Sequence, residues 1–204
     1  MEKRGKYIVF EGGEGCGKTT QSFSLKKYLL EKGINCKKVH EPGYTPLATE
    51  IREKLLNYKE EIDPLTEIFL FEAGRADLFQ KEIIPSLNKG QTIISDRSGY
   101  STLAYQGYGG ERDLNLIKKL NHIATRGIKP DLTFIIDINP ERGLKKEVSS
   151  NRFAEKGLEY HQRVRQGFLD IAKENDDCVV VPYIEGIEKM QSIIRDIMQK
   201  RLNL

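Results

Sequence analysis

The feature that most constrains the fold of this chain is a glycine-rich run that ends in Lys-Thr. Eight consecutive residues match the pattern G-x-x-x-x-G-K-[ST] in full, namely Gly12, Gly13, Glu14, Gly15, Cys16, Gly17, Lys18 and Thr19. A short apolar run at 7–10 precedes them, and a helical pattern follows from Lys18. In such a loop the backbone N–H groups point at phosphate oxygens, so glycine is needed where φ is positive or a side chain would clash. The pattern therefore predicts a strand, a phosphate-binding loop and a helix N-terminus, in that order.

Two side chains of this loop have predicted contacts with a nucleotide. Lys18 is expected to reach the β- and γ-phosphates, and Thr19 is expected to offer its hydroxyl to Mg²⁺. The loop alone leaves the reaction open, because GTPases, ATPases and kinases share it.

The rest of the chain alternates short apolar runs with helical patterns. The pattern predicts strands at 7–10, 36–40, 92–95, 132–138 and 179–181, and helices at 18–32, 46–58, 64–89, 113–126, 157–174 and 186–202, with another helix from Pro140. Pro85 is expected to kink or split the helix at 64–89. This alternation predicts a three-layer α/β/α fold, in which helices cover both faces of a five-stranded parallel sheet. Because we find no repeat or linker, residues 1–204 are expected to form a single domain.

The charge balance and the cysteines narrow the class of protein. Lys and Arg total 33 and Asp and Glu total 30, and this net charge of +3 is too balanced for a dedicated nucleic-acid binder. No apolar run approaches the roughly 20 residues of a membrane span, and the run after the charged residues 1–6 is too short for a signal-peptide core. Three widely spaced cysteines argue against a disulfide framework or a zinc site. We therefore expect a cytoplasmic protein with neither a nucleic-acid polymer nor a membrane as its partner.

A second motif, Asp96-Arg97, follows the predicted strand at 92–95. Ligands in open α/β sheets bind outside the carboxyl ends of the strands, so Asp96 is well placed to hold Mg²⁺ or a water bound to it. Arg97 offers a fork of N–H donors that fits a phosphate. An arginine beside the metal suggests a second phosphorylated ligand, hence transfer between two phosphates. A capping Asp followed by a solvated Arg is the alternative interpretation.

The residues that follow Arg97 resemble the signature of the thymidylate kinase family. Residues 96–107 read Asp-Arg-Ser-Gly-Tyr-Ser-Thr-Leu-Ala-Tyr-Gln-Gly, which is similar to the family's Asp-Arg-x-x-x-Ser-Thr-x-Ala-Tyr-Gln-Gly. Four other segments resemble family motifs in the family's order: the loop at 11–20, Glu-Pro-Gly-Tyr-Thr at 41–45, the Phe-x-x-x-Arg helix at 69–75 and the strand entry at 129–137. The resemblance implies a P-loop kinase fold and a homodimer that phosphorylates dTMP to dTDP with MgATP in dTTP synthesis.

The resemblance also implies a role for individual side chains. Glu14 would accept a hydrogen bond from the 3′-hydroxyl of dTMP, and Arg97 would hold its phosphate. Phe71 would stack on thymine, Arg75 would hydrogen-bond the base, and Tyr105 would disfavour ribose. The full set implied for dTMP is Glu14, Phe71, Arg75, Arg97, Ser101, Thr102, Tyr105 and Gln106. On spacing alone, Phe71 also fits a core position and Arg75 a solvated helix charge. No protein base is expected, because the dTMP phosphate is itself the attacking oxyanion.

Residues 141–156 are expected to form a short, basic, mobile lid, with five basic residues against three acidic ones. Members of the family carry an arginine either in the phosphate loop or in the lid, and Gly15 stands at the loop position. The chain therefore resembles the lid-arginine, bacterial type, with Arg152 as a candidate catalytic residue beside Lys18, Asp96 and Arg97. The family's Asp-Arg-x-Glu is here Asn151-Arg152-Phe153-Ala154, while His40 and Tyr44 replace a common Arg and Gly.

Two alternatives to dTMP phosphorylation stay open at this point. The first is a kinase for another nucleoside monophosphate or for a deoxynucleoside, against which Phe71, Arg75 and Gln106 argue together. The second is a nucleotide-binding module without transfer activity, whose only support is the reduced lid.

Overall fold

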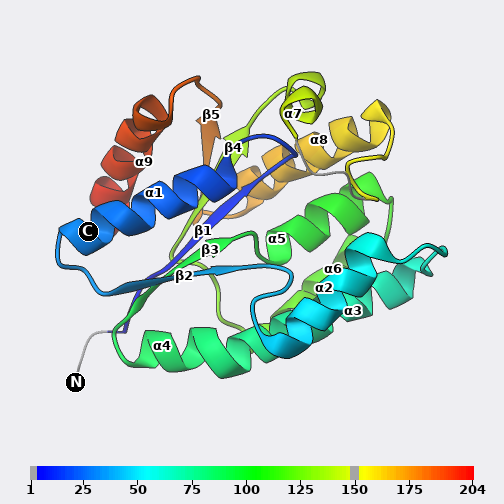
Figure 1. The fold of residues 1–204 in the computed structure, drawn as a ribbon, viewed down its shortest axis with the longest axis horizontal. Helices are drawn as coiled ribbons and strands as arrows, with labels where there is room; N and C mark the ends of the chain where they lie inside the picture. Colours follow the sequence, from blue (N-terminus) through cyan, green and yellow to red (C-terminus); the bar gives the residue numbers. More distant parts are fainter. Residues whose placement is uncertain (1–3, 148–151) are drawn as a thin grey trace.

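The computed structural model describes residues 4–147 and 152–204, and these form one sheet of five parallel strands (Figure 1). The strands are β1 (Tyr7–Gly12), β2 (Cys36–His40), β3 (Thr92–Asp96), β4 (Leu132–Asp137) and β5 (Cys178–Pro182). Their order is β2-β3-β1-β4-β5, and every neighbouring pair is parallel. In this register Phe10 lies opposite Asp96 on one side and Phe134 on the other. The predicted five-stranded parallel sheet is confirmed.

Helices connect the strands along the described chain. They are α1 (Lys18–Glu31), α2 (Pro46–Asn57), α3 (Pro64–Leu78), η1 (Phe79–Ile83), α4 (Ile84–Asn88), α5 (Gly99–Thr102), η2 (Leu103–Gly109), α6 (Leu114–Ala124), α7 (Pro140–Lys146), α8 (Leu158–Glu174) and α9 (Ile187–Leu202). The helix predicted at 64–89 is split as expected, with the π-helical segment η1 before Pro85 and Pro85 in the first turn of α4.

Residues 99–109 were not predicted to be helical, yet α5 and η2 cover them. Glycine normally weakens a helix, but here it allows close packing. A Cβ on Gly107 would lie 2.5 Å from Leu114 Cδ2, and one on Gly109 would lie 2.6 Å from Val164 Cγ2. These glycines therefore let η2 approach its neighbours closely. Local helix propensity does not reveal this reason for a helix.

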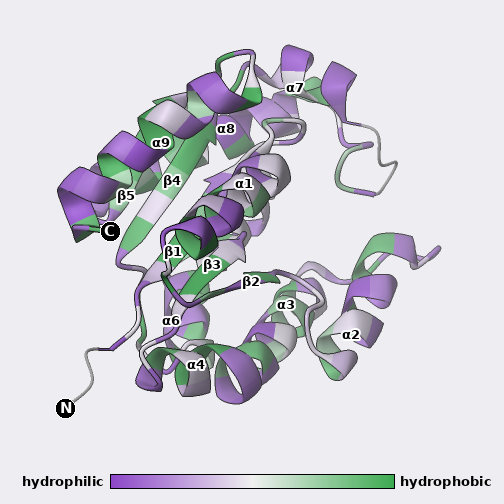
Figure 2. Cartoon of the chain, turned by 60° about the vertical axis from the view of Figure 1, so that its left-hand side comes forward, coloured by the Kyte–Doolittle hydropathy of each residue, from purple (hydrophilic) through white to green (hydrophobic). Residues whose placement is uncertain are grey.

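Alternate residues of β1 face the two helical layers. Ile8 and Phe10 lie in a core cluster with Leu25 and Leu29 of α1 and with Met190 of α9. On the other face, two clusters join the sheet to α3, η1 and α4 and to η2, α6 and α8. Figure 2 shows the central strands largely in hydrophobic colours between helices with hydrophilic outer turns. The predicted three layers are thus confirmed.

The carboxyl ends of β1 and β3 bring two predicted motifs together. Residues 12–17 leave the sheet at the end of β1, and Asp96 ends the neighbouring strand β3. Within residues 4–147 and 152–204, no helix is long and apolar enough to span a lipid bilayer.

Candidate active site

The loop between β1 and α1 has the backbone conformation expected of a phosphate cradle. Gly12, Gly15 and Gly17 have φ values of 140°, 62° and 86°, a region that side chains rarely adopt. A Cβ on Gly12 would lie 2.5 Å from the Ile136 carbonyl oxygen, and one on Gly15 would lie 2.0 Å from the Gly143 carbonyl oxygen. Position 15 has no room for an arginine side chain, because α7 packs directly against it.

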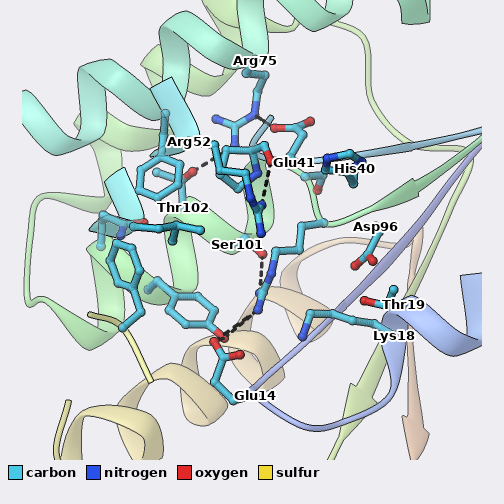
Figure 3. Close-up of a pocket in the computed structure, with 18 of the residues that line it drawn as sticks. Glu14, Lys18, Thr19, His40, Glu41, Arg52, Arg75, Asp96, Ser101 and Thr102 are labelled. Atoms are coloured by element: carbon cyan, nitrogen blue, oxygen red, sulfur yellow. Dashed lines mark hydrogen bonds and ion pairs between the residues drawn. The ribbon is translucent and has the colours of Figure 1, made fainter. Parts of the chain in front are cut away.

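Lys18, Thr19 and Asp96 lie together at one end of a pocket (Figure 3). The buried ammonium of Lys18 donates to the Gly13 carbonyl at 2.9 Å, so it is folded back over the loop. Thr19 is exposed to the pocket. Asp96 is buried, and its Oδ2 lies 3.7 Å from Lys38 Nζ. This end of the pocket combines two oxygen donors for a cation with ammonium groups that suit an anion.

The pocket has a volume of about 370 Å³ and gathers most of the predicted site residues. Its lining includes Glu14, Lys18, Thr19, Phe71, Arg75, Asp96, Arg97, Ser101, Thr102, Tyr105 and Gln106. These residues come from three separate parts of the sequence, 14–19, 71–75 and 96–106, which the fold brings together around one space.

Arg97 links the phosphate loop to α5 and η2. Its Nη1 donates to the Gly12 carbonyl at 3.4 Å and to Ser101 Oγ at 3.2 Å. Its Nη2 donates to Glu14 Oε1 at 3.3 Å and to the Tyr105 hydroxyl at 3.2 Å, and that hydroxyl donates to Glu14 Oε1 at 2.7 Å. Burial favours a higher pKa for Glu14, but Arg97, Lys18 and Tyr105 outweigh it and lower the pKa to about 2. Glu14 therefore holds Arg97 as an anion.

Glu11, which was not among the predicted site residues, fixes the backbone on the far side of Arg97. Its Oε1 accepts from Ser98 N and Oγ, both at 2.8 Å, and from Ser101 N at 3.1 Å, while its Oε2 accepts from Ser101 Oγ at 2.6 Å. Arg97 itself has a φ of 76°, which these contacts hold in place. Burial raises the pKa of Glu11. The sequence feature that could have pointed to Glu11 is its position, since it is an acidic residue at the end of an apolar strand.

Arg75 is buried at the opposite end of the pocket from Lys18 (Figure 3). Its Nε donates to Glu41 Oε2 at 2.8 Å, its Nη1 pairs with Glu72, and its Nη2 donates to Thr102 Oγ1 at 3.0 Å. Burial, only partly offset by Arg75, raises the pKa of Glu41 to about 7. Arg75 is therefore a fixed fork inside the pocket and not a solvated helix charge.

Phe153 joins the aromatic side chains of the pocket. Its ring centroid lies 6.0 Å from that of Phe71 and 6.4 Å from that of Tyr105. It is buried and lines the pocket, although it belongs to the segment predicted as a lid. Gln106 Nε2 donates to Glu67 Oε1 at 2.8 Å, behind these rings. Phe71 therefore lies in the pocket wall and not in the packed core.

Arg152 lies beside α3 and is not among the described residues that line the pocket. Its guanidinium pairs with Glu67 of α3 and lies 5.0 Å from the Phe153 ring centroid. The structure does not bring it to Lys18 or Arg97. Asn151 and the other residues of 148–151, which belong to the predicted lid, lie outside the described residues. The catalytic role expected for Arg152 stays a prediction.

Three basic side chains that were not predicted as site residues also line the pocket, namely Lys38, His40 and Arg52. Arg52 of α2 donates from Nη1 to the Pro42 carbonyl at 2.8 Å, so the loop at 41–45 orients it. Burial lowers the pKa of His40, and Arg52 and Lys38 act in the same direction. The sequence feature that could have pointed to Arg52 is its position on the helix that follows that loop. Spacing alone does not distinguish such a residue from a surface charge.

Comparison with known proteins identifies the family. The model of the thymidylate kinase family matches residues 10–194. A thymidylate kinase of Carboxydothermus hydrogenoformans is 46% identical over 197 residues, which cover 95% of each chain. One from Dehalococcoides mccartyi is 47% identical over 165 residues, or 79% of each chain. The crystal structure of thymidylate kinase from Ehrlichia chaffeensis superposes with a TM-score of 0.81 at 37% identity and covers 96% of this chain and 99% of that one. The chain belongs to the thymidylate kinase family.

Proposed function

We propose that this chain transfers the γ-phosphoryl group of ATP to dTMP, giving dTDP and ADP in dTTP synthesis. One observation carries the proposal. A single pocket has the phosphate loop with Lys18 at one end and Phe71 and Arg75 at the other, and Arg97 hydrogen-bonds to both the loop and the acceptor side. Such a pocket suits a nucleotide whose phosphate faces a second, loop-bound phosphate.

The chemistry needs positioning and charge neutralisation. A phosphate oxygen of dTMP attacks the γ-phosphorus, a new O–P bond forms, and the bond to the bridging oxygen breaks so that ADP leaves with the electron pair. Arg97 and Arg52 would hold the acceptor phosphate, and Lys18 would leave the Gly13 carbonyl to follow the transferring group. Asp96 and Arg152 complete the proposed catalytic set, with Arg152 acting after it leaves Glu67.

The acceptor side supplies recognition of the nucleoside. Phe71 would stack on the base, Arg75 would donate a hydrogen bond to a base carbonyl, and Ser101, Thr102 and Gln106 would line the base pocket. Tyr105 and Glu14 would face the sugar, where Tyr105 would disfavour a ribose 2′-oxygen. The partly buried hydrogen bond between Tyr105 and Glu14 supports this arrangement.

The residues at the loop end fit Mg²⁺. Thr19 and Asp96 offer hard oxygen atoms beside the phosphate loop, as Figure 3 shows. Magnesium is commonly held by one or two protein oxygens together with substrate phosphates and waters, so the two suffice. Thr19 and Asp96 would hold the ion, in part through water. When bound, Mg²⁺ supplies positive charge that neutralises the phosphates of ATP.

We also propose one kinase domain that forms a cytoplasmic homodimer and binds single nucleotides. Large apolar side chains are exposed on the adjoining helices α2, α3 and α6: Leu47, Leu65, Phe69, Leu116 and Ile123. This face suits a second copy of the chain, and Phe69→Glu combined with Ile123→Glu should convert a dimer to a monomer in sedimentation analysis. Three buried cysteines without disulfide bonds agree with a reducing compartment.

The test of the function is ADP release measured separately with dTMP, UMP, CMP, AMP and GMP. We expect dTMP to be turned over far faster than the other four. An equal or better rate with another monophosphate would assign the chain a different acceptor. Tight ATP binding with no ADP formed from any of them would indicate a binding module.

A further inference from the structure

Nearly all the hydrogen-bond donors of Arg75 are already committed in the structure. A guanidinium has five N–H groups in a rigid fork. Nε donates to Glu41, Nη1 donates to Glu72 and to Asn121 Oδ1 at 2.8 Å, and Nη2 donates to Thr102. Among the described residues, one N–H of Nη2 is left. A nucleotide in the pocket therefore meets a single donor from Arg75, and the orientation of that donor depends on the other four bonds.

Asn121 of α6 supplies the one neutral amide among these partners. Its Oδ1 accepts from Arg75, and its Nδ2 donates to the Gly99 carbonyl at 2.9 Å. Arg75 has donors only and the carbonyl is an acceptor only, so one orientation of the amide satisfies both. Asn121 thereby ties α3, which carries Arg75, to the first residue of α5.

The packing at Gly99 shows how closely this amide is fitted. A Cβ on Gly99 would lie 2.8 Å from Asn121 Oδ1 and 2.9 Å from its Cγ. The amide therefore lies directly against the Gly99 Cα, and any larger residue at 99 would displace it. Gly99 stands two residues after Arg97, and its neighbour Ser98 is held by Glu11. Asn121 thus links the base end of the pocket to the segment that carries Arg97.

We propose that Asn121 is a positioning residue for base selection, which aims the remaining N–H of Arg75 at a carbonyl oxygen of the base. The proposal rests on the base-reading role of Arg75 proposed above. A 4-oxo pyrimidine presents an acceptor to that N–H, whereas a 4-amino pyrimidine presents a donor and is disfavoured. Without Asn121, Arg75 keeps three partners but gains a second free N–H and freedom to turn, so selection weakens.

The test compares kcat and KM for dTMP and dCMP in Asn121→Leu, which keeps the branched shape of the side chain but loses both hydrogen bonds. We expect KM for dTMP to rise about tenfold and the preference for dTMP over dCMP to fall about tenfold, as for one lost hydrogen bond to a charged group. The kcat with dTMP and the KM for ATP should change less than about twofold, because Lys18 and Arg97 are untouched. Asn121→Asp keeps the acceptor for Arg75 and should restore the preference. Asn115→Leu, at an exposed position of α6, is the matched control and should change nothing.

Gly99→Ala provides a second route if Asn121→Leu fails to fold. The added Cβ should displace the Asn121 amide and reproduce the loss of preference. An unchanged preference in these variants would overturn the proposal, as would an equal loss of kcat with both acceptors. Arg75→Leu separates the two hypotheses. If Arg75→Leu leaves the KM and the preference for dTMP unchanged, the base-reading role itself is wrong. If it abolishes the preference while Asn121→Leu does not, only the role of Asn121 is wrong.

Discussion

The Glu147 carboxylate accepts a hydrogen bond from the backbone N–H of Gly15, with 3.2 Å between Oε2 and the nitrogen. Gly15 belongs to the phosphate loop, whose N–H groups are the predicted donors to ATP. Glu147 directly follows α7, and Gly143 of that helix closes over Gly15. An anionic side chain from the lid region thus occupies one donor of the loop. We expect ATP to displace this carboxylate when it binds to the loop.

Glu147→Gln is expected to lower the KM for ATP about threefold at saturating dTMP. The neutral amide is a weaker acceptor for the Gly15 N–H and does not repel the phosphates. A change in KM of about threefold corresponds to the free energy of one modest hydrogen bond. Steady-state kinetics over a range of ATP concentrations measures this KM. Glu141→Gln, at an exposed position on α7, is the matched control and should have the wild-type KM. An unchanged or higher KM in Glu147→Gln would show that this contact does not compete with ATP.

Arg97→Ala is expected to lower kcat about 10³-fold while the protein still folds. Its guanidinium contacts both the Gly12 carbonyl of the phosphate loop and Ser101 of α5, and an arginine at a transferring phosphoryl group has effects of this size. Stopped-time ADP assays and thermal unfolding measure the two quantities. Because Arg97 has a positive φ, Arg126→Ala is a suitable control: Arg126 is exposed, has a φ of 53° and lies away from the pocket. Near-normal turnover in Arg97→Ala would remove this residue from the mechanism.

The sequence predicted those parts of the site that local chain order determines. Lys18 and Asp96 follow directly from a loop pattern and from the end of an apolar strand, and the parallel sheet brings them together. Arg52 was missed although its partner Pro42 is 10 residues away, because a basic residue on a helix has the spacing of a surface charge. Glu11 and Asn121 were missed because their partners are far along the chain: Glu11 contacts Ser98, 87 residues away, and Asn121 contacts Arg75, 46 residues away. Hydrophobic periodicity carries no information about such pairs.

The same reasoning explains what was found and missed in the fold. The predicted strands and long helices agree with the structure to within a few residues. The central strands β1 and β3 are buried at every residue, so they stand out in the sequence as short continuous apolar runs between helical patterns. The helical segment at 99–109 was missed because its glycines serve close packing against α6 and α8. The position of Arg152 beside Glu67 was equally out of reach, because it depends on where Phe153 packs between Phe71 and Tyr105.

Arg152→Ala is expected to lower kcat about tenfold or more while changing the KM for ATP less than threefold. A lid arginine that reaches the transferring group acts in the transition state and not in ground-state binding of ATP. Arg142→Ala is the control, since Arg142 lies on exposed α7 and pairs with Glu185. A change in the KM for ATP alone, with kcat retained, would contradict the lid-arginine assignment and leave Arg152 as a partner of Glu67.

Glu41 is expected to make the protein less stable as the pH rises from about 4.5 to about 7. Burial raises the pKa of its carboxyl from 4.5 to about 7, so the folded state binds more protons than the unfolded state within that window. The slope of the unfolding free energy with pH is proportional to the protons bound by the unfolded state minus those bound by the folded state. The contribution of Glu41 to this slope is therefore negative between about pH 4.5 and pH 7, and it is zero above about pH 7. Glu41→Gln removes the titration.

Urea unfolding of both proteins between pH 5 and pH 8 isolates this group, because every other ionisable residue is common to them. The free energy of unfolding of the wild type relative to Glu41→Gln should fall as the pH rises, by an amount on the order of 2 kcal/mol, and then level off. Glu61→Gln, an exposed change in the segment before α3, should show no such trend. A difference that does not vary with pH over this range would show that Glu41 is ionised in the folded protein as well, so that Arg75 outweighs burial.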